Sequence, residues 1–307
     1  MHGEVQRLRG NGHPTPGRTS ARVRVRENLP PRLLLVLDAD PAVHQALEGL
    51  LRREDRAIED AYDSAQAMDL LRRLPCEVVV AGAEPNGGGD GRALLRQVRT
   101  LRPEARVILT GDADPARALA AIRGRAYCYF HKPFPPGLIA DMVQQALNAS
   151  AWRDDLRVIS ARPEWCTLDV RSKLEAAERA TQLVREMTAD VPAGVREDIA
   201  SAFRELLING IEHGALSDPH KRVRASLIRT ARSVVVEIED PGRGFSLEHL
   251  SHAAITNPED SPIRHVEVRA KQGNRPGGFG ILMARNMVDE LVYNEKRNAV
   301  LFVKYLK

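Results

Sequence analysis

Between Arg32 and Asn148 the sequence alternates five times between a short apolar run and a longer amphipathic stretch, a pattern that strongly constrains the fold. Apolar runs of this length are typical of buried strands, and the stretches between them carry apolar residues at helical spacing. The expected strands cover 33–37, 56–59, 77–81, 106–110 and 127–130, and the expected helices cover 43–51, 63–74, 90–101, 115–123 and 137–149. The alternation predicts an α/β fold, a (βα)5 doubly wound parallel sheet, with any functional site at the carboxyl ends of the strands.

Length and composition predict two folded domains behind a basic tail. The chain has 307 residues, of which 43% are apolar, and this is enough for two cores of ordinary size. Seven arginines and two glutamates give residues 1–32 a charge of +5, against +4 for the whole chain, so the basic character belongs to the tail. Its richness in Gly, Pro and Arg predicts disorder. We expect a tail over 1–31, a first domain over 32–148, a helix extension and linker over 149–164, and a second domain over 165–307.

Several kinds of protein are excluded by motifs that the sequence lacks. The three cysteines show no CxxC spacing and the nine histidines no HExxH motif, so neither a disulfide framework nor a zinc site is indicated. No apolar run approaches the ~18 residues that cross a bilayer, and the tail lacks the apolar core of a signal peptide. We therefore expect a cytoplasmic protein that does not bind membrane or nucleic acid directly.

The predicted strand ends of the first domain carry a set of polar residues. Asp38 follows the first strand, Thr110 ends the fourth, Tyr129 lies in the fifth, and Lys132 follows the fifth within a Lys-Pro-Phe sequence. In this order they resemble the first acidic residue, the hydroxyl residue, the switch aromatic and the lysine-proline motif of a two-component receiver domain. The resemblance covers the whole first domain and implies a receiver-like fold.

Two positions depart from the receiver pattern. Gly82 stands where the third strand would end in the phosphoacceptor aspartate, and Ala39 stands at the second acidic position. Because a Mg²⁺-assisted acceptor needs one carboxylate for the acyl phosphate and others to hold the metal, we do not expect phosphorylation. We predict a pseudo-receiver that acts by contact, in which Lys132 pairs with Asp38. The Lys132–Pro133 bond is a candidate for the cis form found at some tight X-Pro turns.

The stretch from Ser201 to Gly214 predicts a helix with one apolar and one polar face. At about 100° per residue, Glu205, Asn209 and His213 fall on one arc, and the opposite arc is apolar. The amide oxygen of Asn209 suits Mg²⁺, which takes few protein ligands and completes its shell with phosphate oxygens and water. Glu205, one turn away, is placed to act as a base. An ordinary buried helix with a polar edge is the alternative.

A predicted strand within 233–239 then runs directly into Asp240, Gly242 and Gly244. An ionised carboxylate at a strand end is suited to accept hydrogen bonds from the exocyclic amine of adenine. The two glycines would let the backbone bend closely around the ring. An ordinary turn with Asp and Gly in their usual places is the alternative.

A second glycine cluster, Gly277, Gly278 and Gly280, opens directly into a helix expected to extend to Leu291. Such a junction presents free backbone N–H groups and a positive dipole end to a phosphate. The long segment before the cluster has little periodicity, and we expect a lid whose cations, Arg275 first among them, close over the γ-phosphate. A flexible loop carrying solvated charges is the alternative.

In their order, the three stretches resemble the boxes of the GHKL ATPase superfamily, in its anti-sigma-factor serine kinase branch. The resemblance covers the second domain and implies an α+β Bergerat-type sandwich that binds Mg·ATP. It also implies transfer of the γ-phosphoryl group to a serine of an anti-anti-sigma (STAS-type) protein, with a sigma factor as a further partner. Glu205 would be the catalytic base, Asn209 the metal ligand and Asp240 the adenine reader. Gly210 departs from the pattern, where alanine is more common, and weakens the helix without changing the site chemistry.

Three functions fit the sequence. The first is a protein serine/threonine kinase, the second is a non-catalytic switch in which ATP selects a binding partner, and the third is a slow ATPase. Autophosphorylation on histidine is not expected, because no histidine lies between Lys132 and Phe203, where related histidine kinases carry their acceptor. The helix expected over 172–187 further predicts a homodimer, because the resembling kinases pair their subunits through it.

Overall fold

A computed structural model describes residues 31–82, 91–244 and 280–306 of the chain. From Pro31 onward the residues form one compact unit. The predicted basic tail, the predicted lid, Arg275, Gly277 and Gly278 lie outside the described residues. Among the helices that are described, none combines the length and the apolar character needed to cross a membrane.

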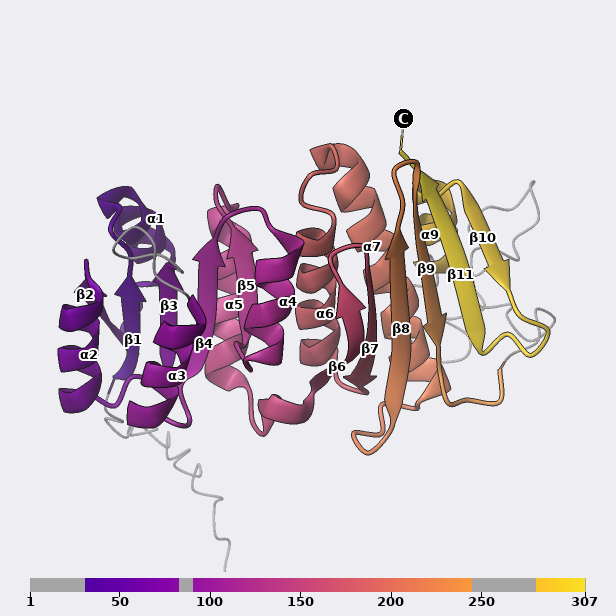
Figure 1. Ribbon diagram of the computed structural model, residues 1–307. Helices are drawn as coiled ribbons and strands as arrows, with labels where there is room; N and C mark the ends of the chain where they lie inside the picture. Colours follow the sequence, from indigo (N-terminus) through magenta and orange to yellow (C-terminus); the bar gives the residue numbers. More distant parts are fainter. Residues whose placement is uncertain (1–30, 83–90, 245–279, 307) are drawn as a thin grey trace, which may run out of the picture. The chain divides into compact units, whose positions relative to one another are not determined.

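The first part of the unit is a five-stranded parallel sheet with helices on both faces, in the order β2-β1-β3-β4-β5 (Figure 1). Its strands are β1 (Arg32–Leu37), β2 (Arg56–Ala61), β3 (Val78–Gly82), β4 (Arg106–Gly111) and β5 (Cys128–His131). Its helices are α1 (Pro41–Leu51), α2 (Ser64–Arg73), α3 (Gly91–Leu101), α4 (Pro115–Arg123) and α5 (Pro136–Asn148). This strand order places the topological switch point between β1 and β3, where ligand sites of doubly wound folds form.

The alternation of side chains along the strands produces two cores. Leu34 and Val36 of β1 pack in one core with residues of α1 and α5, whereas Leu35 and Leu37 pack in the other with residues of α2, α3 and α4. A strand buried on both faces reads as a continuous apolar run, which is why these strands are visible in the sequence. Aspartate caps begin three of the helices, each with its carboxylate accepting a backbone N–H of the first turn: Asp40, Asp63 and Asp114.

The second part is a six-stranded antiparallel sheet in the order β10-β11-β9-β8-β7-β6, with helices packed on one face (Figure 1). The strands are β6 (Leu156–Arg162), β7 (Trp165–Arg171), β8 (Arg222–Arg229), β9 (Ser233–Glu239), β10 (Glu290–Tyr293) and β11 (Ala299–Tyr305). The helices are α6 (Leu174–Met187), α7 (Ala193–Asn209) and α9 (Gly280–Met287), with short turns η1 (Trp152–Asp154) and η2 (Gly210–Gly214). The α/β class, with a parallel sheet followed by an α+β layer, is confirmed.

Two expected elements differ from the structure. The expected linker over 149–164 is wrong for its second half, because Leu156–Arg162 form β6 and pair with β7. A register shift between Val158 and Ser160 interrupts the alternation of this strand, so its period of two does not appear in the sequence. The helix expected to reach Leu291 ends at Met287, and Leu291 lies in β10, opposite Phe302 of β11.

The helix expected over Ser201–Gly214 is α-helical only as far as Asn209. Its last turn widens into a π-turn, η2, in which the N–H of Ala215 donates to the carbonyl of Gly210 at 2.8 Å. The chain thereby leaves the helix axis immediately after Asn209. Single π-turns of this kind are frequent at functional sites, because they redirect side chains without ending the helix.

Candidate functional site

Helix α7 holds Glu205 and Asn209 on its polar edge because its other side is part of the core. Phe203, Leu206 and Leu207 are at most 2% exposed and anchor the helix against the six-stranded sheet. One amide atom of Asn209, Nδ2, is completely buried and has no hydrogen-bond partner in the described part of the chain. A buried amide without a partner is costly, so this side chain is suited to a ligand.

The first residue of α9 lies against this polar edge. A Cβ atom placed on Gly280 would lie 2.9 Å from Oε2 of Glu205, 3.6 Å from Nδ2 of Asn209 and 3.8 Å from its Oδ1. Only glycine therefore fits here without displacing the Glu205 carboxylate. Gly280, the last residue of the second glycine cluster, thus lies beside Glu205 and Asn209, although it follows Asn209 by 71 residues in the sequence.

Asp240 lies at the end of β9, and glycines surround it. A Cβ on Gly214 would lie 2.1 Å from Cγ of Asp240, one on Gly242 would lie 2.7 Å from its Oδ1, and one on Gly210 would lie 3.5 Å from its Cβ. The π-turn that follows Asn209 therefore packs directly on the aspartate. A Cβ on Gly210 would also lie 3.3 Å from Cγ1 of Val223, so a side chain at this position would press on β8.

Backbone contacts hold Asp240 in place. Its Oδ1 accepts the N–H of Gly242 at 2.8 Å, its own N–H donates to the carbonyl of Asn298 at 2.8 Å, and its carbonyl accepts from Nδ2 of Asn298 at 3.1 Å. Burial raises the pKa of the half-buried Asp240 carboxyl, and the Gly242 N–H opposes part of this effect. A carboxylate short of solvent gains when a ligand donates a hydrogen bond to it, which fits an adenine amine.

Two further predicted residues lie around this centre. Gly244 has a positive φ of 78°, and a Cβ there would lie 1.6 Å from the carbonyl oxygen of Lys296, so glycine is required for the turn after β9. His213 lies in η2 with an exposed side chain, and no hydrogen bond joins it to another described residue. The structure therefore brings Glu205, Asn209 and Gly280 into contact and leaves His213 on the surface.

Sequence analysis missed two charged residues beside Glu205. Nη1 of Arg204 donates to Oε1 of Glu205 at 3.3 Å, and Nε of Arg204 donates to Oε1 of Glu178 on α6 at 2.8 Å. The hydrogen bond to Glu178 is the largest cause of the raised pKa of the Arg204 guanidinium. In the sequence Arg204 is one arginine among many, and only its position directly before Glu205 distinguishes it.

The described residues contain no group of three or more His, Cys, Asp or Glu side chains arranged to hold a metal ion. A magnesium ion at this site would therefore depend on Asn209 and on the phosphate oxygens of a nucleotide, a mode that suits Mg²⁺. The unpartnered Nδ2 of Asn209 is a donor suited to a phosphate oxygen, and the Oδ1 of the same side chain would hold the metal.

The predicted receiver site is closed by an ion pair. Nζ of Lys132 lies 2.5 Å from Oδ2 of Asp38, which is 3% exposed, so the predicted pairing of the two residues is confirmed. A Cβ on Gly82, at the end of β3, would lie 3.0 Å from the same oxygen. Thr110 is buried at the end of β4, and the Lys132–Pro133 bond is cis. Asp112 directly follows β4, but its carboxylate pairs with Arg117 at 3.1 Å, and β3 ends in Gly82 rather than in an aspartate.

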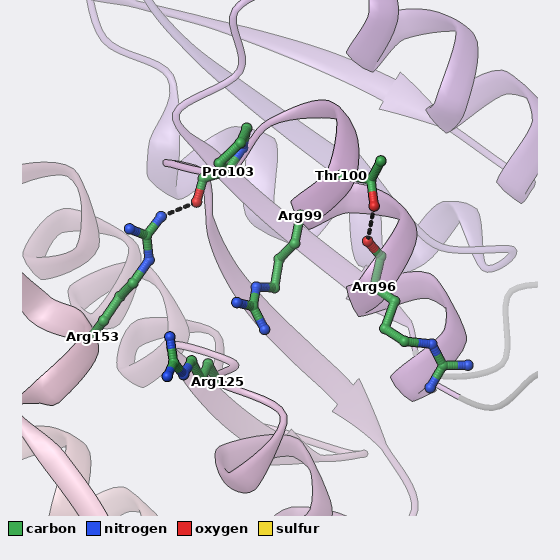
Figure 2. Close-up of a pocket in the computed structure, with 6 residues that line it drawn as sticks. All are labelled: Arg96, Arg99, Thr100, Pro103, Arg125 and Arg153. Atoms are coloured by element: carbon green, nitrogen blue, oxygen red, sulfur yellow. Dashed lines mark hydrogen bonds between the residues drawn. The ribbon is translucent and has the colours of Figure 1, made fainter.

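A separate cavity of about 470 Å³ lies near the amino-terminal end of β4, and Figure 2 shows the side chains around it. None of the predicted site residues lines it. Its lining comes from α3, from the turn before β5 and from η1: Arg96, Arg99, Thr100, Pro103, Arg125 and Arg153. Arg99 donates to the carbonyl of Gly124, and Arg153 donates to the carbonyl of Pro103, so two of the four guanidinium groups brace the backbone.

Comparison with known proteins gives relatives that match part of the chain. Over 116 residues the chain is 35% identical to the C4-dicarboxylate transport transcriptional regulatory protein DctD of Pseudomonas aeruginosa, a match that covers 38% of this chain and 25% of that protein. It is 28% identical over 163 residues to the hydrogenase transcriptional regulatory protein HoxA of Cupriavidus necator, which covers 51% of this chain and 33% of that protein. The matches thus span a quarter to a third of the length of these curated relatives.

Among solved structures, the chain is similar to the receiver domain of NtrX from Brucella abortus, with 27% identity, 38% of this chain and 99% of that chain covered, and a TM-score of 0.35. Another similar structure is the signal receiver domain of an HD domain-containing protein from Pseudomonas fluorescens, with 28% identity and a TM-score of 0.37. This match covers 41% of this chain and 93% of that chain. Two family profiles match the sequence itself, one over residues 34–144 and one over residues 170–304. The chain therefore joins a response regulator receiver domain to a histidine kinase-like ATPase domain.

Proposed function

We propose that this protein is an ATP-dependent protein serine/threonine kinase of the anti-sigma-factor type, regulated through its receiver domain. Its substrate would be a serine of an anti-anti-sigma (STAS-type) protein, and a sigma factor would be a further partner. The observation that carries the proposal is the contact of Gly280 with both Glu205 and Asn209. This proximity supports the proposal, in which Glu205 is the base and Asn209 the magnesium ligand, because the N–H groups at the start of a helix are suited to phosphate.

Each residue has a role in this proposal. The carboxylate of Asp240 accepts a hydrogen bond from the amine of adenine, and contacts with Gly214 and Gly242 set its position. Asn209 holds the metal, which when bound neutralises charge on the phosphates and orients them. Glu205 accepts the proton of the substrate hydroxyl as its oxygen bonds to the γ-phosphorus, while the bond from the γ-phosphorus to the β–γ bridging oxygen breaks and ADP leaves. Gly277, Gly278 and Arg275 are proposed to complete the phosphate site.

A second proposal is a non-catalytic switch, in which ATP occupancy selects a binding partner. It is favoured by the hydrogen bond that Glu205 already receives from Arg204, because a carboxylate held by another side chain is less free to contact a substrate hydroxyl. The closed Asp38–Lys132 pair also suits a domain that acts by contact. In this case the protein would bind Mg·ATP with the same residues and transfer nothing.

The experiment that separates the two proposals compares the wild type with Glu205→Gln. Both proteins should bind Mg·ATP with similar affinity in calorimetry, because the base does not contact adenine. Only the wild type should transfer labelled γ-phosphate to a STAS-type protein encoded by the same organism. Equal inactivity of the two proteins, with firm nucleotide binding, would leave the switch as the function. Failure of both to bind adenine nucleotides with magnesium would refute both proposals.

A further inference from the structure

Strand β5 is an edge strand of the parallel sheet, and the side chains of α6 complete its hydrogen bonding. Nε of Arg179 donates to the carbonyl of Tyr127 at 2.8 Å, and Nε2 of Gln182 donates to the carbonyl of Tyr129 at 3.3 Å. Oε2 of Glu186 accepts the N–H of His131 at 3.1 Å, and Nδ1 of the same histidine lies 3.0 Å away. We call these contacts the α6–β5 seam.

The seam is regular and buried. Its three helix residues are spaced three and four apart, a rise of about 10 Å, and its strand residues are spaced two apart, a rise of about 13 Å. Arg179, Gln182 and Glu186 are between 1% and 4% exposed. The guanidinium of Arg179 also lies 4.5 Å from the ring centre of Tyr127 and 5.2 Å from that of Trp152. Buried polar groups with this many partners specify one arrangement of helix and strand.

A reciprocal contact joins the two sheets from the other side. Strand β6 is an edge strand of the antiparallel sheet, and Nη2 of Arg123, the last residue of α4, donates to the carbonyl of Ala161 in β6 at 2.9 Å. Each edge strand is therefore approached by a helix of the other domain. Covering edges in this way protects them from pairing with other chains and fixes the receiver domain on the ATPase domain.

The helix that forms the seam also reaches the nucleotide site. Glu178 is adjacent to Arg179 on α6, and it accepts the hydrogen bond from Arg204 that was described above. Arg204 in turn holds Oε1 of Glu205, while Oε2 of Glu205 faces Gly280. Helix α6 and the hydrogen bonds from Glu178 through Arg204 thus lead from the edge of the receiver sheet to the proposed base.

We propose that the receiver domain acts on the nucleotide site through α6, with Glu178 and Arg204 as positioning residues that aim the carboxylate of Glu205. The inference rests on the role of Glu205 under the proposed function. It explains how a receiver without an acceptor aspartate regulates its partner domain, since a ligand or protein that shifts β5 also shifts α6. Because the Glu178 and Arg204 side chains are 24% and 39% exposed, their ion pair contributes little to stability and acts on position.

The test compares Glu178→Gln with Glu175→Gln in the full chain. Glu175 lies on the same helix, is exposed, and is not bonded to Arg204, so it is the matched control. The carboxyl ¹³C resonance of Glu205, assigned by its absence in Glu205→Gln, should shift in Glu178→Gln and stay in place in Glu175→Gln. Turnover in phosphoryl transfer should fall roughly tenfold or more in Glu178→Gln, with an unchanged Kd for Mg·ATP.

A second variant tests the receiver half of the inference. Gln182→Met removes the donor to Tyr129 while keeping the side-chain volume. If this variant does not fold, Arg123→Gln tests the reciprocal contact instead, because it removes the guanidinium that donates to the carbonyl of Ala161. Either should shift the Glu205 resonance in the same direction as Glu178→Gln. An unmoved Glu205 resonance in Glu178→Gln would overturn the inference. An unmoved resonance in a folded Gln182→Met or Arg123→Gln variant would overturn the part played by the receiver domain. If the Glu205 resonance shifts in Glu178→Gln but the wild type shows no transferase activity, the kinase proposal is refuted and the positioning of Glu205 through α6 is retained.

Discussion

At the scale of single residues, the half-buried carboxyl of Asp240 links the stability of the fold to pH. Its carboxyl is half-buried, and burial raises its pKa in the folded protein above that of the unfolded chain, which is about 3.9. Its contribution to stability is therefore present in full below the unfolded value and is lost as pH rises through the folded value. At neutral pH the ionised form is a cost that a hydrogen-bond donor on a nucleotide would offset.

We therefore expect Asp240→Asn to have opposite effects on stability and binding. The asparagine oxygen can still accept the N–H of Gly242, while the buried charge is removed, so the melting temperature of the free protein at pH 7 should stay equal or rise. The loss of a charge-assisted hydrogen bond should weaken adenine nucleotide binding about 10- to 100-fold. Differential scanning fluorimetry between pH 3 and 8 and calorimetry with Mg·ATP measure the two effects. A lower melting temperature of Asp240→Asn at pH 7 would contradict the assignment of burial as the dominant cause of the raised pKa of Asp240.

Gly280 allows a test of the pocket geometry at a single atom. In Gly280→Ala the new methyl group would lie 2.9 Å from Oε2 of Glu205, and the end of that flexible side chain would move away. The fold should remain intact, while phosphoryl transfer should fall roughly tenfold or more because the base is displaced. Gly194→Ala is the matched control and should retain turnover, because Gly194 lies in the first turn of α7 and a Cβ added there would meet no neighbouring atom within 4 Å. Equal turnover in both variants would show that Gly280 and Glu205 do not act together.

At the scale of elements, the π-turn η2 joins the two parts of the candidate site. It follows Asn209 directly and packs Gly210 and Gly214 on Asp240 at the end of β9. The widened turn therefore connects Asn209, the proposed metal ligand, to Asp240, the proposed adenine reader.

Gly214→Ala should damage this junction more than any helix propensity would suggest. Its Cβ would lie 2.1 Å from Cγ of Asp240, so either the turn or the strand end must move. Overpacking of this kind costs about 1–3 kcal/mol, measured as the free energy of unfolding in urea. The Gly194→Ala control should change that quantity by well under 1 kcal/mol in either direction. A neutral Gly214→Ala would mean that η2 and Asp240 are not in contact.

At the scale of the whole molecule, the two domains belong to one compact unit, and strand β3 of the first domain ends in Gly82 rather than in an aspartate. Asp38 is paired with Lys132, and any side chain larger than that of Gly82 would come close to the Asp38 carboxylate. The covered face of α6 also bears on assembly. The predicted homodimer stays a prediction, and a second copy would have to use a face of α6 other than the seam.

The receiver domain should not become phosphorylated. Incubation of the full chain with acetyl phosphate and Mg²⁺, followed by intact-mass analysis, should give no labile phosphoryl adduct, because no aspartate stands at the end of β3. A receiver domain with that aspartate, treated in parallel, provides the positive control. An adduct mapped to residues 32–148 would contradict this prediction.

What the sequence determined by itself is local in character. The parallel sheet follows from apolar runs of strand length between aspartate-capped helices, and the Asp38–Lys132 pair follows from two strand ends that a doubly wound sheet must bring together. The polar edge of α7 likewise follows from spacing alone. Strand β6 could not be found in this way, because its register shift breaks the alternation on which strand prediction depends.

Only the tertiary structure decided which distant groups touch. The contact of Gly280 with Glu205, the link from Glu178 through Arg204, and the seam between α6 and β5 each join residues that are far apart along the chain. Helical spacing gives every polar residue on an exposed arc the same status, and it does not say which of them faces a partner. That choice depends on the packing of whole elements, where the energies of many apolar contacts exceed the preference of any single residue.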